Sequence, residues 1–155
     1  MFMQADTAFL LFLLAVSFFI GVSRGKKKLG LFILAIYVVS ALFAYIPLDS
    51  LTQGRSDQEI FLFRAGAFLI VLILIVLFLL RSFRGALSLD GVWWEILLLS
   101  ILLSGFLMTS LLNLAPKVLV ENNLLNLSPV ALKFFANPVY SQWWIILPIL
   151  GVIFL

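Results

Sequence analysis

The sequence predicts an all-α membrane protein, a polytopic bundle of transmembrane helices. Of its 155 residues, 65% are hydrophobic and 11% are charged, whereas soluble domains carry about 25% charged residues. Residues 60–80 form one apolar run, in which no side chain from 65 to 80 is polar. A helix of roughly 20 such residues crosses the ~30 Å hydrocarbon core of a bilayer. A barrel is not expected, because barrel strands alternate apolar and polar residues and these runs do not.

Four apolar segments are predicted to span the membrane within one integral membrane domain, residues 1–155. The predicted spans are residues 7–22, 29–48, 60–80 and 92–114. Asp6 or Thr7 is placed to cap the first span. Pro47 marks the end of the second span, and Trp93 and Trp94 open the fourth, where an interfacial aromatic belt is expected.

The region after the fourth span is predicted to hold a short interfacial helix and a fifth apolar run. Ser128 and Pro129 match an N-cap with proline at the first helical position. Residues 129–136 are amphipathic, as in helices that lie in the membrane interface. Residues 139–155 approach the lower limit of length for a span, and Pro148 interrupts them. They are expected to form either a fifth span or a half-helix that packs into the bundle.

The distribution of lysine and arginine predicts the orientation, since cytoplasmic loops carry an excess of both. The first and third loops hold six such residues, whereas the second holds only Arg55. We therefore expect a multi-pass membrane protein, with the N-terminus outside and the first and third loops in the cytoplasm. The six cations are expected to contact lipid headgroups there: Arg24, Lys26, Lys27, Lys28, Arg81 and Arg84.

The sequence lacks the residues on which many catalytic and metal sites depend. It contains no cysteine and no histidine, which removes thiol nucleophiles, soft metal ligands and the commonest acid–base side chain. It also contains no zinc-protease or P-loop motif. We therefore expect no enzyme activity, no cofactor and no metal. Nucleic-acid binding is not expected either, because the aromatic residues lie mostly inside apolar runs rather than on a basic face.

Two ionisable residues lie within predicted spans, where such residues are functional candidates by default. Arg64 is about one turn into the third span and Glu95 about one turn into the fourth, so their charges are expected at opposite faces of the membrane. Each is expected to reach its own interface. The expected partners are Asp49, Asp57 or Glu59 for Arg64, and Lys26 to Lys28, Arg81 or Arg84 for Glu95. The alternative makes Glu95 a proton or cation site near a cytoplasmic opening.

Small and hydroxyl residues recur at helical spacing. They are Gly21 and Gly25, Ser40 and Ala44, and Ser100, Ser104, Gly105, Thr109, Ser110 and Asn113. Small residues four apart let helices approach closely, and hydroxyls can hydrogen-bond across the contact. The fourth span, which carries Ser100 and Ser104, is also the best candidate to line a water-filled path. On a 3.6-residue period its polar groups divide between two faces, which favours packing.

The order of the segments is itself informative. A short first span closes in a turn rich in glycine and basic residues, the fourth span follows an LSLDG turn, and an aromatic stretch comes last. The residues concerned are Gly21, Arg24, Gly25 and Leu29, then Leu87 to Gly91 with Asp90 as a further candidate, and Phe134 with Phe135. Over roughly residues 7–137 this layout resembles the colicin V production protein (CvpA-like) family. The chain departs from that pattern at Trp93 and Trp94, where the family tends to have glycines, and in its additional tail.

The resemblance implies a small accessory protein of a bacterial inner membrane, acting in secretion or envelope maintenance. Its expected partners are the lipid bilayer and either further copies of the chain or other membrane proteins. Two alternatives follow from the residues themselves. One is an oligomeric channel or small-solute transporter built around the fourth span, and the other is an assembly subunit of a larger membrane complex.

Overall fold

The computed structural model describes residues 5–83 and 92–155, and every regular element in them is a helix. The long helices are α1 (Ala5–Arg24), α2 (Lys26–Phe43), α4 (Asp57–Ser82), α5 (Trp93–Asn113) and α8 (Pro138–Phe154). The short ones are α3 (Leu48–Leu51), α6 (Lys117–Glu121), α7 (Pro129–Ala131) and the π-helix η1 (Leu132–Ala136). The predicted all-α class is confirmed for this part of the chain.

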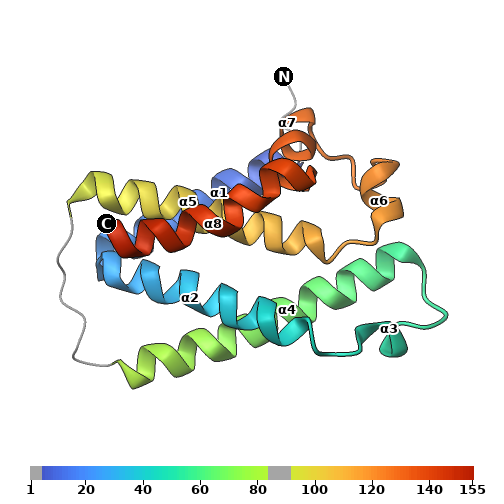
Figure 1. The fold of residues 1–155 in the computed structure, drawn as a ribbon, viewed down its shortest axis with the longest axis horizontal. Helices are drawn as coiled ribbons and strands as arrows, with labels where there is room; N and C mark the ends of the chain where they lie inside the picture. The colour runs from blue at the N-terminus through green and yellow to red at the C-terminus, as the bar shows by residue number, and fades with distance from the viewer. Residues whose placement is uncertain (1–4, 84–91) are drawn as a thin grey trace.

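The five long helices run between two ends of the molecule (Figure 1). At one end α1 and α4 end, α2 and α5 begin, and α8 ends. We call this the basic end, because it carries Arg24, Lys26, Lys27, Lys28 and Arg81. At the other end, which we call the loop end, lie α3, α6, α7 and the start of α4.

Three helices of the described residues, α1, α4 and α5, are long and apolar enough to cross a membrane. Residues 129–136 and α8 form a further candidate as a pair bent by 63°, which gives up to four. Helix α2 lies in the second predicted span, but it has only 18 residues and opens with three lysines. It ends at Phe43 rather than at residue 48, because Pro47 lacks an N–H and disfavours helical geometry in the residue before it.

Helix α4 begins before the predicted apolar run, because a capping box precedes it. The Glu59 N–H donates to Ser56 Oγ at 3.4 Å, and the Ser56 N–H donates to Glu59 Oε2 at 3.1 Å. These two bonds satisfy backbone N–H groups that have no partner inside the helix. The helix therefore starts at Asp57 and gains a polar first turn at the loop end.

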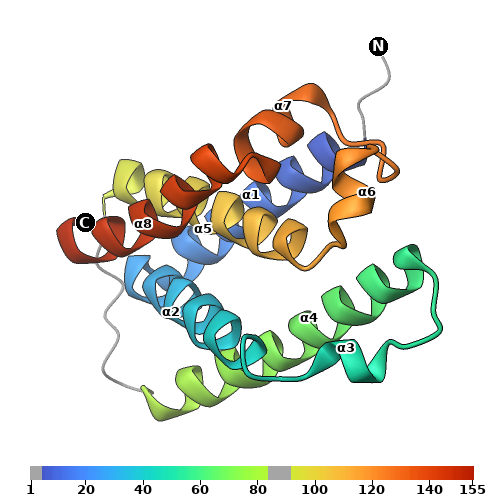
Figure 2. The same ribbon diagram turned by 45° about the vertical axis from the view of Figure 1, so that its right-hand side comes forward.

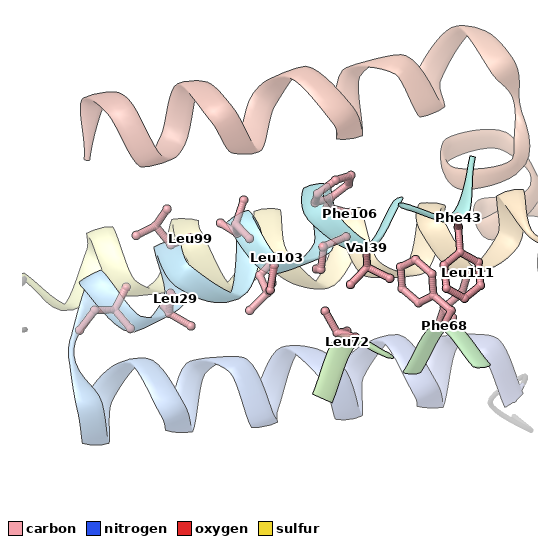
Figure 3. Packing of buried hydrophobic residues seen from close by; sticks show 13 residues of the cluster. Leu29, Val39, Phe43, Phe68, Leu72, Leu99, Leu103, Phe106 and Leu111 are labelled. Atoms are coloured by element: carbon pink, nitrogen blue, oxygen red, sulfur yellow. The ribbon is translucent and has the colours of Figure 1, made fainter. Parts of the chain in front are cut away.

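Helix α5 is the centre of the bundle. Helices α1, α2 and α8 pack against it, whereas α4 packs mainly on α2 (Figures 1 and 2). The main core lies between α2, α4 and α5, with Val39, Leu103 and Phe106 buried in it (Figure 3). At its loop-end side Phe43 and Phe68 meet edge to face at 5.4 Å between ring centroids, which is a favoured geometry for aromatic pairs.

A second, smaller core holds the segment predicted to lie in the interface. Phe135 of η1 and Ala131 of α7 are buried against Met108 and Leu112 of α5. The Phe135 ring also lies 5.2 Å from the ring of Trp144. The apolar face of residues 129–136 is therefore covered by the protein itself, while Val130 and Phe134 remain exposed.

Glycines allow the closest helix contacts. A Cβ atom at Gly21 would lie 2.5 Å from Ile96 Cγ2, and one at Gly151 would lie 2.6 Å from Leu102 Cδ1. A Cβ at Gly105 would overlap the Trp144 ring. These three positions bring α1 and α8 against α5, as expected for small residues between membrane helices. Gly25 has another role, because its φ of 86° makes the turn from α1 to α2.

We expect Gly105→Ala to destabilise the protein, because the added methyl group enters the space of a rigid indole ring. Overpacking of this kind costs about 1–3 kcal/mol. The matched control is Gly66→Ala in α4, where a Cβ would have no neighbour within 4 Å and alanine favours the helix. Thermal unfolding in detergent checks this. An apparent Tm for Gly105→Ala equal to that of Gly66→Ala would contradict the close contact.

Candidate functional site

Three helix ends meet at one lysine at the basic end. Lys26, the first residue of α2, donates from Nζ to Glu95 Oε2 at 2.6 Å and to the main-chain oxygen of Leu155 at 2.5 Å. The Lys26 and Glu95 side chains are 24% and 16% exposed. This cluster ties the starts of α2 and α5 to the end of α8. The predicted pairing of Glu95 with a lysine of the first loop is thus confirmed at Lys26.

The position of Glu95 also suits the start of a helix. It lies in the first turn of α5, where the helix dipole favours a negative charge, and its Oε2 accepts from the Val92 N–H at 3.4 Å. The carboxylate thus has an ammonium and a backbone donor.

Among residues 5–83 and 92–155, there is no group of three carboxylate, histidine or cysteine side chains that could hold a metal ion.

A second ion pair lies at the loop end. Arg64 of α4 donates from Nη2 to Asp49 Oδ1 of α3, one of the three acidic partners expected for it. The Asp49 side chain is almost fully exposed, so this pair lies in polar surroundings where such contacts add little stability. Arg64 Nε is buried and has no hydrogen-bond partner among the described residues. The two ionisable residues therefore lie at opposite ends of the bundle, as the sequence predicts.

The hydroxyls of α5 donate mainly to their own helix. Ser100 Oγ donates to the Ile96 carbonyl and Ser104 Oγ to the Ser100 carbonyl, each at 2.7 Å. Both serines are fully buried. Ser104 Oγ also lies 3.4 Å from Ser17 Oγ of α1. Hydroxyls that bond to the carbonyl four residues earlier need no other partner, so these serines serve as small contact residues between α1 and α5.

A cavity of about 290 Å³ lies between α2, α4, α5 and α8. Its polar lining comes from Tyr37, Ser40, Ser110 and Asn113, and its aromatic walls from Phe43, Phe68 and Phe106. The volume is roughly twice that of the ~150 Å³ apolar cavity that holds one benzene molecule. Sequence analysis singled out Ser110 and Asn113 on the fourth span and Ser40 on the second. It did not bring Ser40 together with the other two, because they come from different helices.

A buried carboxylate joins α1 to α7. Asp6 Oδ2 accepts from the backbone N–H of Ser128 at 2.9 Å and from Ser128 Oγ at 2.6 Å. Ser128 Oγ in turn accepts from the Ala131 N–H at 3.2 Å, which confirms the predicted cap. The prediction that Asp6 or Thr7 caps the first span is wrong, because α1 already includes both residues.

The remaining predicted site residues divide into two groups. Arg24, Lys27, Lys28 and Arg81 lie at the basic end with Lys26. Arg84 and Asp90 lie outside the described residues.

Sequence analysis missed the contact between Asp6 and Ser128, because the two residues are 122 positions apart. The signal that the sequence offered was a lone aspartate next to a predicted span.

Comparisons with known proteins found no family model, no curated protein and no solved structure that this chain matches.

We expect Glu95→Gln to lower the apparent Tm by a few degrees, because it leaves the partly buried Lys26 ammonium without its carboxylate. The exchange Lys26→Glu with Glu95→Lys restores part of this loss if the attraction between the two side chains is responsible. Glu59→Gln, at an exposed position, is the control for removal of a carboxylate near a helix start. A direct interaction would be contradicted if the double variant lost as much Tm as the losses of its two single variants added together.

Proposed function

We propose that the chain is a small accessory protein of a bacterial inner membrane, acting in secretion or envelope maintenance through contacts with other membrane proteins. The proposal combines the resemblance in segment order to the colicin V production protein family with the exposed surface of one helix. It places the basic end at the cytoplasm, as the excess of Lys and Arg favours.

Helix α4 carries this proposal. Of its 26 residues only Phe68 and Leu72 are buried, and α2 is its main neighbour. Large apolar side chains are exposed along its length, among them Leu62, Ile70, Ile73, Leu74, Leu77 and Phe78. A helix attached on one side offers the rest of its surface to lipid or to an apolar helix of another protein. A long exposed apolar surface is typical of contact with a membrane or with another protein.

The alternative of a channel around α5 has less support from the packing. Helix α5 is enclosed by α1, α2 and α8, and 61% of its most apolar stretch is buried inside the molecule. Ser100 and Ser104 bond within the helix. A pore between copies of the chain needs a polar surface facing outward, and α5 does not offer one.

The partner interaction can be tested with a photo-crosslinking amino acid in living cells. At Leu74, which is 60% exposed, we expect adducts with other membrane proteins. The same group at Leu103, which is 5% exposed on α5, is expected to give few or none. Deletion of the gene is expected to increase envelope permeability. Adducts with lipid alone, together with unchanged permeability, would contradict the proposal.

The proposed orientation can be tested by labelling, because the natural chain has no cysteine. A cysteine at Ser50, in α3, is expected to react with a membrane-impermeant maleimide on intact cells. A cysteine at Lys28 is expected to react only after the inner membrane is opened. The reverse pattern would place the basic end outside and would contradict the orientation.

A further inference from the structure

A groove follows the line between α2 and α8 from the basic end. Its outer part, about 410 Å³, is lined by Lys26, Lys27, Gly30, Leu31, Leu34, Leu99, Val152 and Leu155. Its inner part, about 120 Å³, is lined by Gly30, Ile33, Leu34, Tyr37, Ile149, Val152 and Ile153. The two parts share Gly30, Leu34 and Val152, so we treat them as one feature, the α2–α8 groove.

The groove exists because α2 and α8 touch only loosely along this stretch. Both helices pack more extensively on α5 than on each other. Gly30 contributes no side chain, and a Cβ there would lie 3.7 Å from the nearest atom of Val152, which is ordinary contact distance. The inner end is limited by Tyr37, whose hydroxyl donates to the main-chain oxygen of Ile145.

The length of the groove matches one leaflet of a bilayer. Lys27 at its mouth and Tyr37 at its inner end are ten residues apart on α2, which is about 15 Å at 1.5 Å per residue. That is half of the ~30 Å hydrocarbon core. An extended chain that enters at the basic end would therefore end near the bilayer centre.

The chemistry of the lining changes along this length. Between Gly30 and Tyr37 the walls are aliphatic, from Leu31, Ile33, Leu34 and Val152. The mouth is lined by Lys26 and Lys27, with the Glu95 carboxylate paired to Lys26, and Lys28 follows in sequence. The Lys26 ammonium has three donors, of which two reach Glu95 and Leu155. A ligand that fits has an apolar chain and a negative head.

We propose that the α2–α8 groove binds one acyl chain of an anionic phospholipid from the leaflet at the basic end, with its phosphate beside Lys27 and Lys26. Basic pockets between membrane helices on the cytoplasmic side are known to hold such headgroups. The acyl chain fills the space that Gly30 leaves between α2 and α8. The inference needs the chain to lie in a membrane but does not depend on the proposed accessory role.

The test is native mass spectrometry of the full chain, released from micelles that contain equal amounts of phosphatidylglycerol and phosphatidylcholine. We expect one phosphatidylglycerol to stay bound in preference to phosphatidylcholine. Lys27→Gln is expected to weaken its binding about 5-fold, the effect of one cation near a charged headgroup. Arg81→Gln removes a cation at the same end that does not line the groove, and is expected to change binding little.

A second pair of variants separates the groove from general electrostatics. Gly30→Leu fills the groove and is expected to remove the retained lipid. Gly66→Leu in α4, where a Cβ would have no neighbour within 4 Å, is expected to retain it. Circular dichroism of all four variants shows that they are folded. Equal retention of both lipids, or equal losses for Lys27→Gln and Arg81→Gln, would overturn the proposal. So would lipid retention by a folded Gly30→Leu variant.

Discussion

Small residues let α5 lie close to α1 on one side and to α8 on another, and the rest of the bundle is arranged around these contacts. Gly21 leaves room for the Ile96 side chain, Gly105 for the Trp144 ring, and Gly151 for the Leu102 side chain. Ser104 meets Ser17 where α1 and α5 approach. In a lipid environment the hydrophobic effect gives little preference for helix contacts over lipid contacts, so close packing must supply the attraction. Helix α4 lacks such contacts and stays at the edge.

Charge is separated along the axis of the bundle. Among the described residues, cations outnumber carboxylates five to one at the basic end, where Glu95 is the carboxylate. The loop end mixes acidic and basic side chains, as in the pair of Arg64 and Asp49. At the basic end, Lys26 joins three helix ends and also lies at the mouth of the α2–α8 groove. Lys26 thus contributes both to the contacts that hold the bundle together and to the site where we propose that lipid binds.

Much of this architecture could be predicted from the sequence, because apolar runs of this length have few stable structures other than membrane helices. The depth of Arg64 and Glu95 within their runs was enough to place them at opposite ends and to limit their partners to a few candidates. Asp49 and Lys26 are the candidates that the structure shows. Contacts that depend on the three-dimensional arrangement alone could not be predicted. Nothing near Asp6 indicates Ser128, and the cavity beside Ser110 and Asn113 needs walls from four helices. The end of α2 at Phe43 was missed because the apolar run continues through a turn set by Pro47.

Carbene labelling from the lipid phase tests the central claim most directly, that α5 is enclosed by protein while α4 faces the membrane. A photoactivatable phospholipid is incorporated with the chain into liposomes, and labelled peptides are mapped by mass spectrometry. The account predicts dense labelling of α4 between Leu69 and Phe78 and sparse labelling of α5 between Leu99 and Leu112. Equal labelling of the two helices, or stronger labelling of α5, would contradict it.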